Sequence, residues 1–290
     1  MDAVTLDSAA WPAPAKLNRM LRIVGRRADG YHLLQTVFQF LDRGDRLWFE
    51  PRDDGAIVRD GEVVGVPPEA DLTVRAARLL QQATGTSQGA LIRIDKRLPM
   101  GSGLGGGSSD AATTLVALNH HWRTGLTPAA LAELGLRLGA DVPVFVHGQA
   151  AWAEGVGERL TPLDLDEPWF VVLAPACHVA TGAVFGDSEL TRNSSLITIT
   201  DFMMGAGGND CEAVVYRRYP EVAAAASWLA RHGPTRLTGT GACVFAAFPS
   251  AGRAQYVLDR LPPGWKGFVA RGRNRSPLHE RLTRARTALA

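Results

Sequence analysis

Pro99-Met-Gly-Ser-Gly-Leu-Gly-Gly-Gly-Ser-Ser-Asp-Ala-Ala112 is the stretch of sequence that decides the fold. Five glycines lie within residues 101–107, and two serines and an aspartate follow them. Upstream, residues 90–95 alternate between apolar and polar side chains, as in a half-buried strand. The sequence therefore predicts a strand, a glycine loop, a serine cap and a helix, in that order. The apolar side chains that recur at helical spacing are Ala111, Leu115, Leu118 and Trp122.

This order of elements is suited to binding phosphate. The first N–H groups of a helix are unpaired and lie at the positive end of its dipole, so they attract an anion. Glycines let the backbone approach that anion and adopt positive φ. Ser108 and Ser109 can cap the helix or coordinate a Mg²⁺ ion that bridges phosphate oxygens. A flexible linker is the other interpretation, but linkers seldom lead directly into a capped amphipathic helix.

Two common classes of phosphate loop are excluded. No Lys-Ser or Lys-Thr pair follows the last glycine, so this is not a Walker A loop. Residues 101–106 match the dinucleotide pattern GxGxxG, but a second strand ending in an acidic residue should then follow about 20 residues later. Thr127-Pro128 instead begins another helix, with Leu131, Leu134 and Leu138 on one face. A dinucleotide-dependent dehydrogenase is therefore not predicted.

The composition is that of an ordinary globular protein. A chain of 290 residues suggests about two domains, and the net charge of +2 gives no reason to expect nucleic acid or a membrane surface as a partner. No apolar run approaches the ~20 residues of a membrane span. Three widely spaced cysteines without a CxxC pair indicate reduced thiols in a cytoplasmic protein, and no metal cluster built on them.

The chain opens with a predicted strand over residues 11–24 that carries Lys16 and Asn18 in alternate positions. Residues two apart on a strand share a face, so both polar heads lie on one side. A solvated face is one interpretation. The other is functional, because only three of the 31 basic residues are lysines, and a lysine can supply a compact ammonium that arginine cannot.

Asp141 allows two interpretations as well. It stands just ahead of Pro143, a position typical of a helix cap. The alternative is a carboxylate placed at the end of an element within reach of the phosphate loop. The sequence leaves both open.

The rest of the chain predicts an α/β alternation in two domains, with helices on one face of a sheet. We expect strands over 36–41 and 46–50, a hairpin turn at 53–55, and a helix over 71–82. The turn-rich segment 160–168 marks the boundary between domains 1–163 and 164–290. Segment 191–210 is predicted to be a mobile surface loop, and the arginines within 271–286 are predicted to form a solvated terminal face. The other expected elements are strands over 169–174, 236–248 and 267–271 and helices over 181–185, 210–218, 221–232 and 251–261.

Three stretches together resemble the three motifs of the GHMP small-molecule kinases. They are Pro12-Ala-Pro-Ala-Lys-Leu-Asn18, residues 99–112, and Leu237-Thr-Gly-Thr-Gly-Ala-Cys243. The resemblance covers nearly the whole chain, from Pro12 to His279. It implies an α+β, two-domain fold, with an N-terminal α/β domain like ribosomal protein S5, a C-terminal ferredoxin-like domain, and the active site in the cleft between them.

The resemblance also implies an activity, ATP-dependent phosphorylation of an alcohol, with ATP as co-substrate and Mg²⁺. Arg27-Ala-Asp-Gly-Tyr-His32, Gly139-Ala-Asp-Val-Pro-Val-Phe145 and Ser276-Pro-Leu-His279 are similar to the branch of the family that acts on the 2-hydroxyl of diphosphocytidyl methylerythritol in non-mevalonate isoprenoid synthesis. The expected partner is therefore this small molecule, and the expected oligomeric state is a monomer or weak homodimer. The alternatives are another GHMP kinase, acting on mevalonate, homoserine or a sugar, and a nucleotide-binding protein without catalysis.

Site residues follow from the resemblance, position by position. Lys16 and Asp141 correspond to the catalytic pair, and Lys96 lies near the nucleotide end. One departure is visible: Asp71 stands where the family has an asparagine near the adenine, and a carboxylate can accept a hydrogen bond but not donate one. The phosphate loop is Pro99, Met100, Gly101, Ser102, Gly103, Leu104, Gly105, Gly106, Gly107, Ser108 and Ser109, with Ser108 as the candidate Mg²⁺ ligand. The substrate positions are Asn18, Tyr31, His32, Val156, Thr181 and Phe185, of which Tyr31 and Phe185 would stack on the cytosine.

Overall fold

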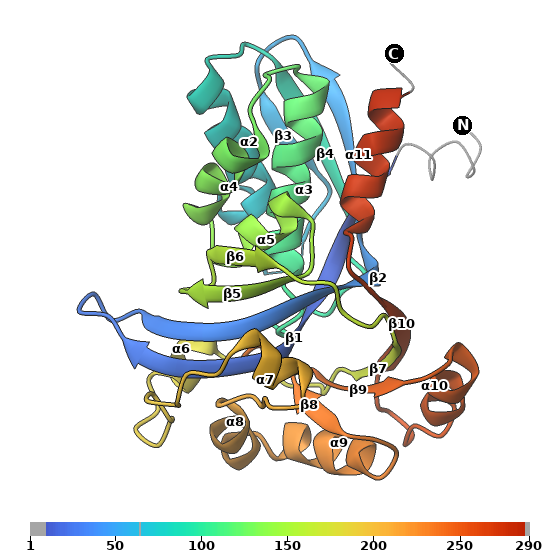
Figure 1. Ribbon diagram of the computed structural model, residues 1–290. Coiled ribbons are helices and arrows are strands. Elements are labelled where there is room, and N and C mark those ends of the chain that lie inside the picture. Colours follow the sequence, from blue (N-terminus) through green and yellow to red (C-terminus); the bar gives the residue numbers. More distant parts are fainter. Residues whose placement is uncertain (1–9, 64, 288–290) are drawn as a thin grey trace.

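A computed structural model describes residues 10–63 and 65–287 of the chain (Figure 1). Its two lobes meet along a pair of long strands that cross the middle of the molecule. The strands are β1 (Trp11–Arg26), β2 (His32–Arg52), β3 (Ile57–Asp60), β4 (Gly89–Asp95), β5 (Ala151–Gly155), β6 (Arg159–Pro162), β7 (Trp169–Leu173), β8 (Thr235–Leu237), β9 (Val244–Phe248) and β10 (Gly267–Arg273). The helices are the 3₁₀ helix η1 (Pro68–Ala70), α2 (Leu72–Thr84), α3 (Gly106–His121), α4 (Pro128–Leu136), α5 (Val142–His147), α6 (Thr181–Phe185), α7 (Ile199–Met203), α8 (Glu212–Arg218), α9 (Pro220–Ala230), α10 (Ala251–Leu258) and α11 (Pro277–Thr287).

The long strand β2 connects the sheet of one lobe to that of the other. It pairs with β1 along its length, with β5 near its start and with β4 near its end. At its centre, Phe40 and Leu41 pair with Arg273 and Gly272 of β10. Two of the sequence predictions are wrong here. The expected strands over 36–41 and 46–50 are one strand, and the turn at 53–55 does not form a hairpin, because β3 pairs in parallel with β4 rather than with β2.

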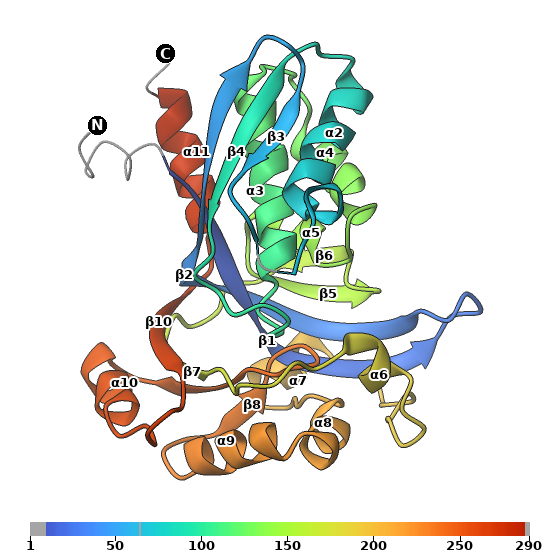
Figure 2. The same ribbon diagram turned by 180° about the vertical axis from the view of Figure 1, so that it is seen from behind.

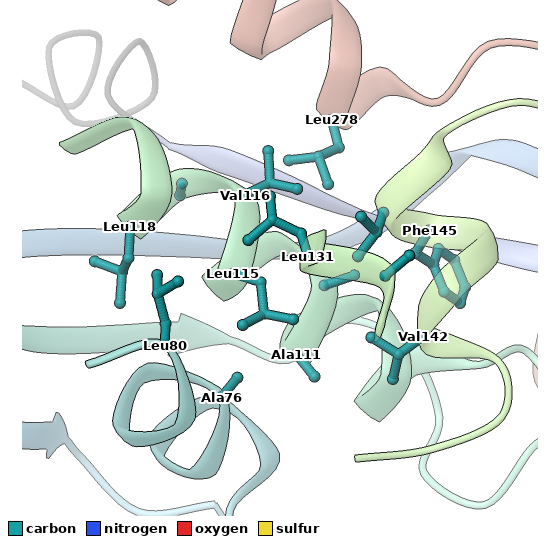
Figure 3. Packing of buried hydrophobic residues seen from close by; sticks show 14 of the residues in the cluster. Ala76, Leu80, Ala111, Leu115, Val116, Leu118, Leu131, Val142, Phe145 and Leu278 are labelled. Carbon is teal, nitrogen blue, oxygen red and sulfur yellow. The ribbon is translucent and has the colours of Figure 1, made fainter. Parts of the chain in front are cut away.

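Helix α3 is the central helix of the N-terminal lobe (Figure 3). It begins at Gly106 with Gly105 as its N-cap, so the predicted serine cap is wrong, and Ser108 lies inside the first turn. The predicted apolar stripe is buried, and helices α2, α4, α5 and α11 surround α3 closely enough that nearly every face of it is buried. Small side chains let the neighbouring elements pack closely around such a helix, in agreement with the run of alanines and threonines within 111–117. The buried hydroxyls of Thr113 and Thr114 donate to the carbonyl oxygens of Pro12 and Asp110.

The C-terminal lobe is a ferredoxin-like domain. Its strands occur in the order β10-β7-β9-β8 and all neighbours are antiparallel, with the chain passing through helices between β7 and β8 and between β9 and β10. The single strand expected over 236–248 is two strands, β8 and β9, because the glycine-rich segment 238–243 turns the chain back on itself. The expected two-domain α+β architecture is confirmed.

After β10 the chain returns to the N-terminal lobe as α11 (Figure 2). The arginine-rich end is therefore not wholly a solvated face, because Leu278 is fully buried against the α3 core. Segment 191–210, expected to lack regular structure, contains α7, which Thr198 and Asp201 begin with a reciprocal capping box. Within the ranges described, no helix has both the length and the apolar character that crossing a bilayer requires.

Candidate active site

A cavity of about 1080 Å³ lies where the two lobes meet. It is lined by β1, the start of β2, the glycine loop, the start of α5, helix α6 and the loop between β8 and β9. Of the residues predicted to be catalytic, to form the phosphate loop or to bind the substrate, only Leu104 and Ser109 do not line it, and both are fully buried. The lining residues among those predicted are Lys16, Asn18, Tyr31, His32, Lys96, Pro99, Met100, Gly101, Ser102, Gly103, Gly105, Gly106, Gly107, Ser108, Asp141, Val156, Thr181 and Phe185.

The glycine loop needs glycine for two physical reasons. Gly103 and Gly105 have φ of +78° and +72°, which other residues rarely adopt. A Cβ on Gly103 would also lie 2.1 Å from the carbonyl oxygen of Thr238, and one on Gly105 would lie 3.0 Å from the Lys16 side chain. The loop is therefore pressed against both the β8–β9 loop and the lysine. Gly105 is the N-cap of α3, so the unpaired N–H groups of that helix face the cavity at Gly106, Gly107 and Ser108.

Lys16 is buried, with 3% of its side chain exposed, yet all three of its N–H groups have acceptors. Its ammonium nitrogen lies 2.5 Å from Asn18 Oδ1, 3.0 Å from the carbonyl oxygen of Gly103 and 3.1 Å from Asp141 Oδ2. Asn18 is itself fixed, because its amide donates to Thr36 Oγ1 at 2.8 Å. The interpretation of Lys16 and Asn18 as a solvated face is therefore wrong.

Asp141 occupies the N-cap position of α5 without capping it. Its backbone is helical (φ −83°, ψ −13°), and its side chain accepts no hydrogen bond from the first turn of α5. The carboxylate instead pairs with Lys16 and leaves a third of its surface exposed. The structure thus decides between the two interpretations that the sequence left open. The Asp141 carboxylate and the Lys16 ammonium meet at the wall of the cavity, beside the glycine loop that leads into α3.

A second charged cluster lies at the other end of the glycine loop. The Lys96 ammonium contacts Asp45 Oδ2 and lies 2.7 Å from Asp110 Oδ2. Burial lowers the pKa of Lys96, but the carboxylates of Asp110 and Asp45 outweigh this effect and raise it overall. Burial raises the pKa of Asp110 to about 7, against the opposing effect of Lys96, and Asp110 Oδ1 has no hydrogen-bond partner within the described residues. Nothing in the sequence marked Asp45 as part of this cluster, because it lies 51 residues away from Lys96.

Asp71, the departure from the family pattern, is paired inside the protein. Its Oδ1 accepts from the Thr73 backbone N–H at 2.8 Å and the Thr73 hydroxyl at 2.7 Å, and its Oδ2 accepts from Arg59 Nη1 at 2.8 Å. The Arg59–Asp71 ion pair is nearly inaccessible to solvent. A carboxylate in place of an amide is thus accommodated by an arginine 12 residues earlier.

The predicted substrate positions surround the opposite end of the cavity. His32 stacks on Phe185, with ring centroids 4.8 Å apart and planes 21° apart, while Tyr31 is 62% exposed. Thr181 lies 3.0 Å from the hydroxyl of Thr240, and the Val156 backbone N–H donates to Glu158. The structure therefore brings these residues to one place. One face of Phe185, which was predicted to stack on the cytosine, is in contact with the His32 ring.

The sequence reasoning missed several lining residues. On β2, Phe38 lies opposite Asn18 with its ring 5.4 Å from the Lys16 ammonium, and Thr36 lies opposite Leu21. Gly239, Thr240 and Gly241 extend from the C-terminal lobe. Strand alternation could have placed Thr36 and Phe38 on one face. The other three lie inside a quoted motif, so their presence was signalled although no role was assigned to them.

Family models match both lobes. "GHMP kinases N terminal domain" matches residues 71–149, and "GHMP kinases C terminal" matches residues 189–266. A protein of Halorhodospira halophila, "4-diphosphocytidyl-2-C-methyl-D-erythritol kinase", is 57% identical over 280 residues, which is 96% of this chain and 97% of that protein.

Solved structures agree with the family models. One, "Crystal structure of 4-(cytidine 5'-diphospho)-2C-methyl-D-erythritol kinase", superposes with a TM-score of 0.79 at 32% identity and covers 91% of this chain and 98% of its own. The Methanococcus jannaschii mevalonate kinase superposes with a TM-score of 0.69 at 14% identity, covering 91% of this chain and 98% of its own, which shows a shared fold alone.

Proposed function

The chain belongs to the GHMP kinase family, and we propose that it transfers the γ-phosphoryl group of ATP to the 2-hydroxyl of 4-diphosphocytidyl-2-C-methyl-D-erythritol. It is a phosphotransferase with an alcohol group as acceptor, in the synthesis of isoprenoid precursors by the non-mevalonate route. The relatives favour this substrate over mevalonate, homoserine or a sugar. The observation that carries the mechanism is the Lys16–Asp141 pair, 3.1 Å apart on the wall of the cavity.

Phosphoryl transfer requires mainly positioning and stabilisation of charge. Asp141 accepts the proton of the substrate hydroxyl, and its exposed third is the surface that the alcohol reaches. The Lys16 ammonium stabilises the negative charge that gathers on the transferred group. Because Asn18 and Gly103 fix the ammonium, this charge is in place before the substrate arrives.

ATP is the co-substrate, and its phosphates bind along the glycine loop to the N–H groups at the start of α3. Mg²⁺ fits this site, because the Ser108 hydroxyl lines the cavity beside the turn that carries Asp141, and Mg²⁺ needs few protein ligands when phosphate oxygens and waters supply the others. We assign Ser108 as its protein ligand. When bound, the ion neutralises charge on the triphosphate.

The base of the substrate occupies the end of the cavity formed by Tyr31, His32 and Phe185. Aromatic side chains provide the stacking surface, and the imidazole provides a polar group that recognises the edge of the base. A small alcohol such as mevalonate has no ring to fill this end. A catalytically inactive protein would have no use for a buried ammonium paired with a carboxylate beside the phosphate loop.

The remaining assignments concern the whole chain. We assign residues 1–163 to the N-terminal domain and 164–290 to the C-terminal domain, because the ferredoxin-like sheet begins at β7. Within the second range, α11 packs against the N-terminal lobe. A monomer or weak homodimer suffices, since all the groups named above come from one chain. We place the protein in the cytoplasm, where ATP is available; its unpaired cysteines, Cys177, Cys211 and Cys243, agree with this.

The test is a competition between acceptors. Purified protein receives ATP labelled at the γ-phosphorus together with equal concentrations of the diphosphocytidyl alcohol, mevalonate and homoserine, and the labelled products are separated. We expect the label only in the diphosphocytidyl product, phosphorylated at the 2-hydroxyl. Label in another acceptor would contradict the substrate assignment, and no label in any acceptor would contradict the kinase activity itself.

A further inference from the structure

Arg192 lies behind the base end of the cavity and connects its two walls. Its guanidinium donates to the carbonyl oxygens of Leu190 (3.1 Å), Phe185 (2.8 Å) and Asp187 (2.7 Å), and through Nε to His32 Nε2 at 3.2 Å. Arg192 does not line the cavity, whereas His32 and Phe185 do. It therefore acts on a ligand only through the residues that it contacts.

The contact with Arg192 determines which nitrogen of His32 carries the proton. A guanidinium has donors and no acceptor, so Nε2 of His32 must be the unprotonated nitrogen. A neutral imidazole then carries its proton on Nδ1. Within residues 10–63 and 65–287, His32 Nδ1 has no hydrogen-bond partner, so this N–H is available to a ligand.

We propose that Arg192 is a positioning residue that fixes His32 as the Nδ1–H tautomer, so that the imidazole donates a hydrogen bond to an acceptor on the pyrimidine of the substrate. The proposal rests on the proposed function for the identity of that substrate. Cytosine offers two adjacent acceptors, O2 and N3, whereas N3 of uracil is a donor. A fixed donor at His32 is therefore a device for reading the acceptor edge of cytosine.

The charges around His32 favour the neutral ring. Burial lowers its pKa, and the positive charges of Arg192 and Arg26 lower it further. Among the described residues that act on the ring, no carboxylate opposes these two arginines. The imidazole is thus neutral at physiological pH, and its donor comes from the tautomer and not from protonation.

The same arginine fixes the orientation of the ring. His32 stacks on Phe185 at a centroid distance of 4.8 Å, and Arg192 binds both the imidazole nitrogen and the Phe185 carbonyl oxygen. The start of β2 and the end of α6 are therefore joined through one guanidinium that has four acceptors. Lysine could not replace it, because an ammonium has three donors and lacks the planar arrangement.

The tautomer is tested first in the free protein by ¹⁵N NMR of the histidine rings, with the His32 signal assigned by its loss in His32→Gln. We expect the chemical shifts of a neutral ring with a protonated Nδ1 and a bare Nε2 at pH 7.5. A protonated Nε2 with a bare Nδ1 would overturn the proposal. This measurement needs no substrate, so it is independent of whether the proposed function is correct.

The second test is the pH dependence of KM for the diphosphocytidyl alcohol in Arg192→Met. At pH 8 we expect KM to rise about 3- to 10-fold over the wild type, the effect of one lost hydrogen bond, with kcat changed less than about twofold. Because a protonated imidazole donates from both nitrogens, the ratio of the variant KM to the wild-type KM should return toward one at acidic pH. Burial and Arg26 still lower the pKa of His32 in the variant, so this return should occur below the ordinary histidine value of about 6.5.

The matched control is Arg22→Met. Arg22 donates to the Ser195 carbonyl oxygen on the same segment but does not contact His32, so its loss loosens the segment and leaves the tautomer unchanged. Its KM ratio should not depend on pH. An Arg192→Met ratio that is close to one at pH 8, or equally raised at every pH, would overturn the proposal. A wild-type protein that does not phosphorylate the diphosphocytidyl alcohol would contradict the proposed function, and the NMR result would still decide the role of Arg192.

Discussion

Asp141→Asn separates the catalytic interpretation of this residue from the helix-capping one. The substitution keeps the size of the side chain and one oxygen that can accept from Lys16, but removes the ability to take a proton. A positioned general base contributes typically 10²- to 10⁴-fold. We therefore expect kcat to fall by about 10²–10⁴, which is about 2.7–5.5 kcal/mol of activation free energy.

The structure also predicts what the substitution leaves unchanged. The Asp141 side chain makes no cap hydrogen bond in α5, so the helix loses none. Its carboxylate is one-third exposed, and Lys16 keeps Asn18 and Gly103 as acceptors, so the free energy of unfolding should fall by at most about 1 kcal/mol. The Kd for ATP should change little, because the glycine loop does not depend on this side chain.

Thr127→Ala is the matched control for capping. The Thr127 hydroxyl accepts from the Ala130 backbone N–H at 3.2 Å at the start of α4, so its removal should cost about 1 kcal/mol of stability while kcat stays at the wild-type value. Steady-state kinetics, ATP titration and thermal unfolding on the three proteins provide the comparison. A kcat of Asp141→Asn within tenfold of the wild type would refute the base assignment. Because asparagine caps a helix about as well as aspartate does, a residue that only capped α5 would show neither a loss of kcat nor a loss of stability in this variant.

Two further predictions concern the glycine loop and the charged cluster beside it. Gly103→Ala should abolish most of the ATP binding measured by titration, because its Cβ would lie 2.1 Å from the Thr238 carbonyl oxygen. The control, Gly125→Ala, has a similar φ of +73° and no atom nearby, so it should cost only about 1 kcal/mol of stability. Equal effects of the two substitutions would show that the clash is unimportant. Asp110→Asn should raise the melting temperature at pH 8 more than at pH 5. The folded-state pKa of Asp110 is raised to about 7, so the wild-type protein loses stability as the pH rises from about 4 to 7. The Asp110→Asn variant has no charge to gain over this range, and its amide oxygen can still accept from Lys96, so its stability does not fall in this way. A gain in melting temperature that is the same at both pH values would contradict this prediction.

Local chemistry explains why some elements were predictable. The strand at 90–95, the helix after the glycine loop and the helix that begins at Pro128 have periodic apolar residues and turn residues within a few positions of their ends. The serine cap was wrong because a glycine with φ of +72° already ends the loop one residue before the helix. The continuous strand β2 was missed because its partner changes from β5 to β10 to β4 along its length, and the sequence of one strand contains no information on its partners.

By itself, the sequence determined the glycine spacing of the predicted phosphate loop, the family resemblance, and the candidates Lys16 and Asp141, because glycine spacing and motif residues are properties of short segments. Only the tertiary structure decided that the ammonium of β1 and the carboxylate ahead of α5 lie 3.1 Å apart. It alone paired Asp71 with Arg59 and turned His32 towards Arg192. The physical reason is that an ion pair or a fixed tautomer depends on distances of a few ångströms between residues far apart in the chain, and packing of the two lobes determines those distances.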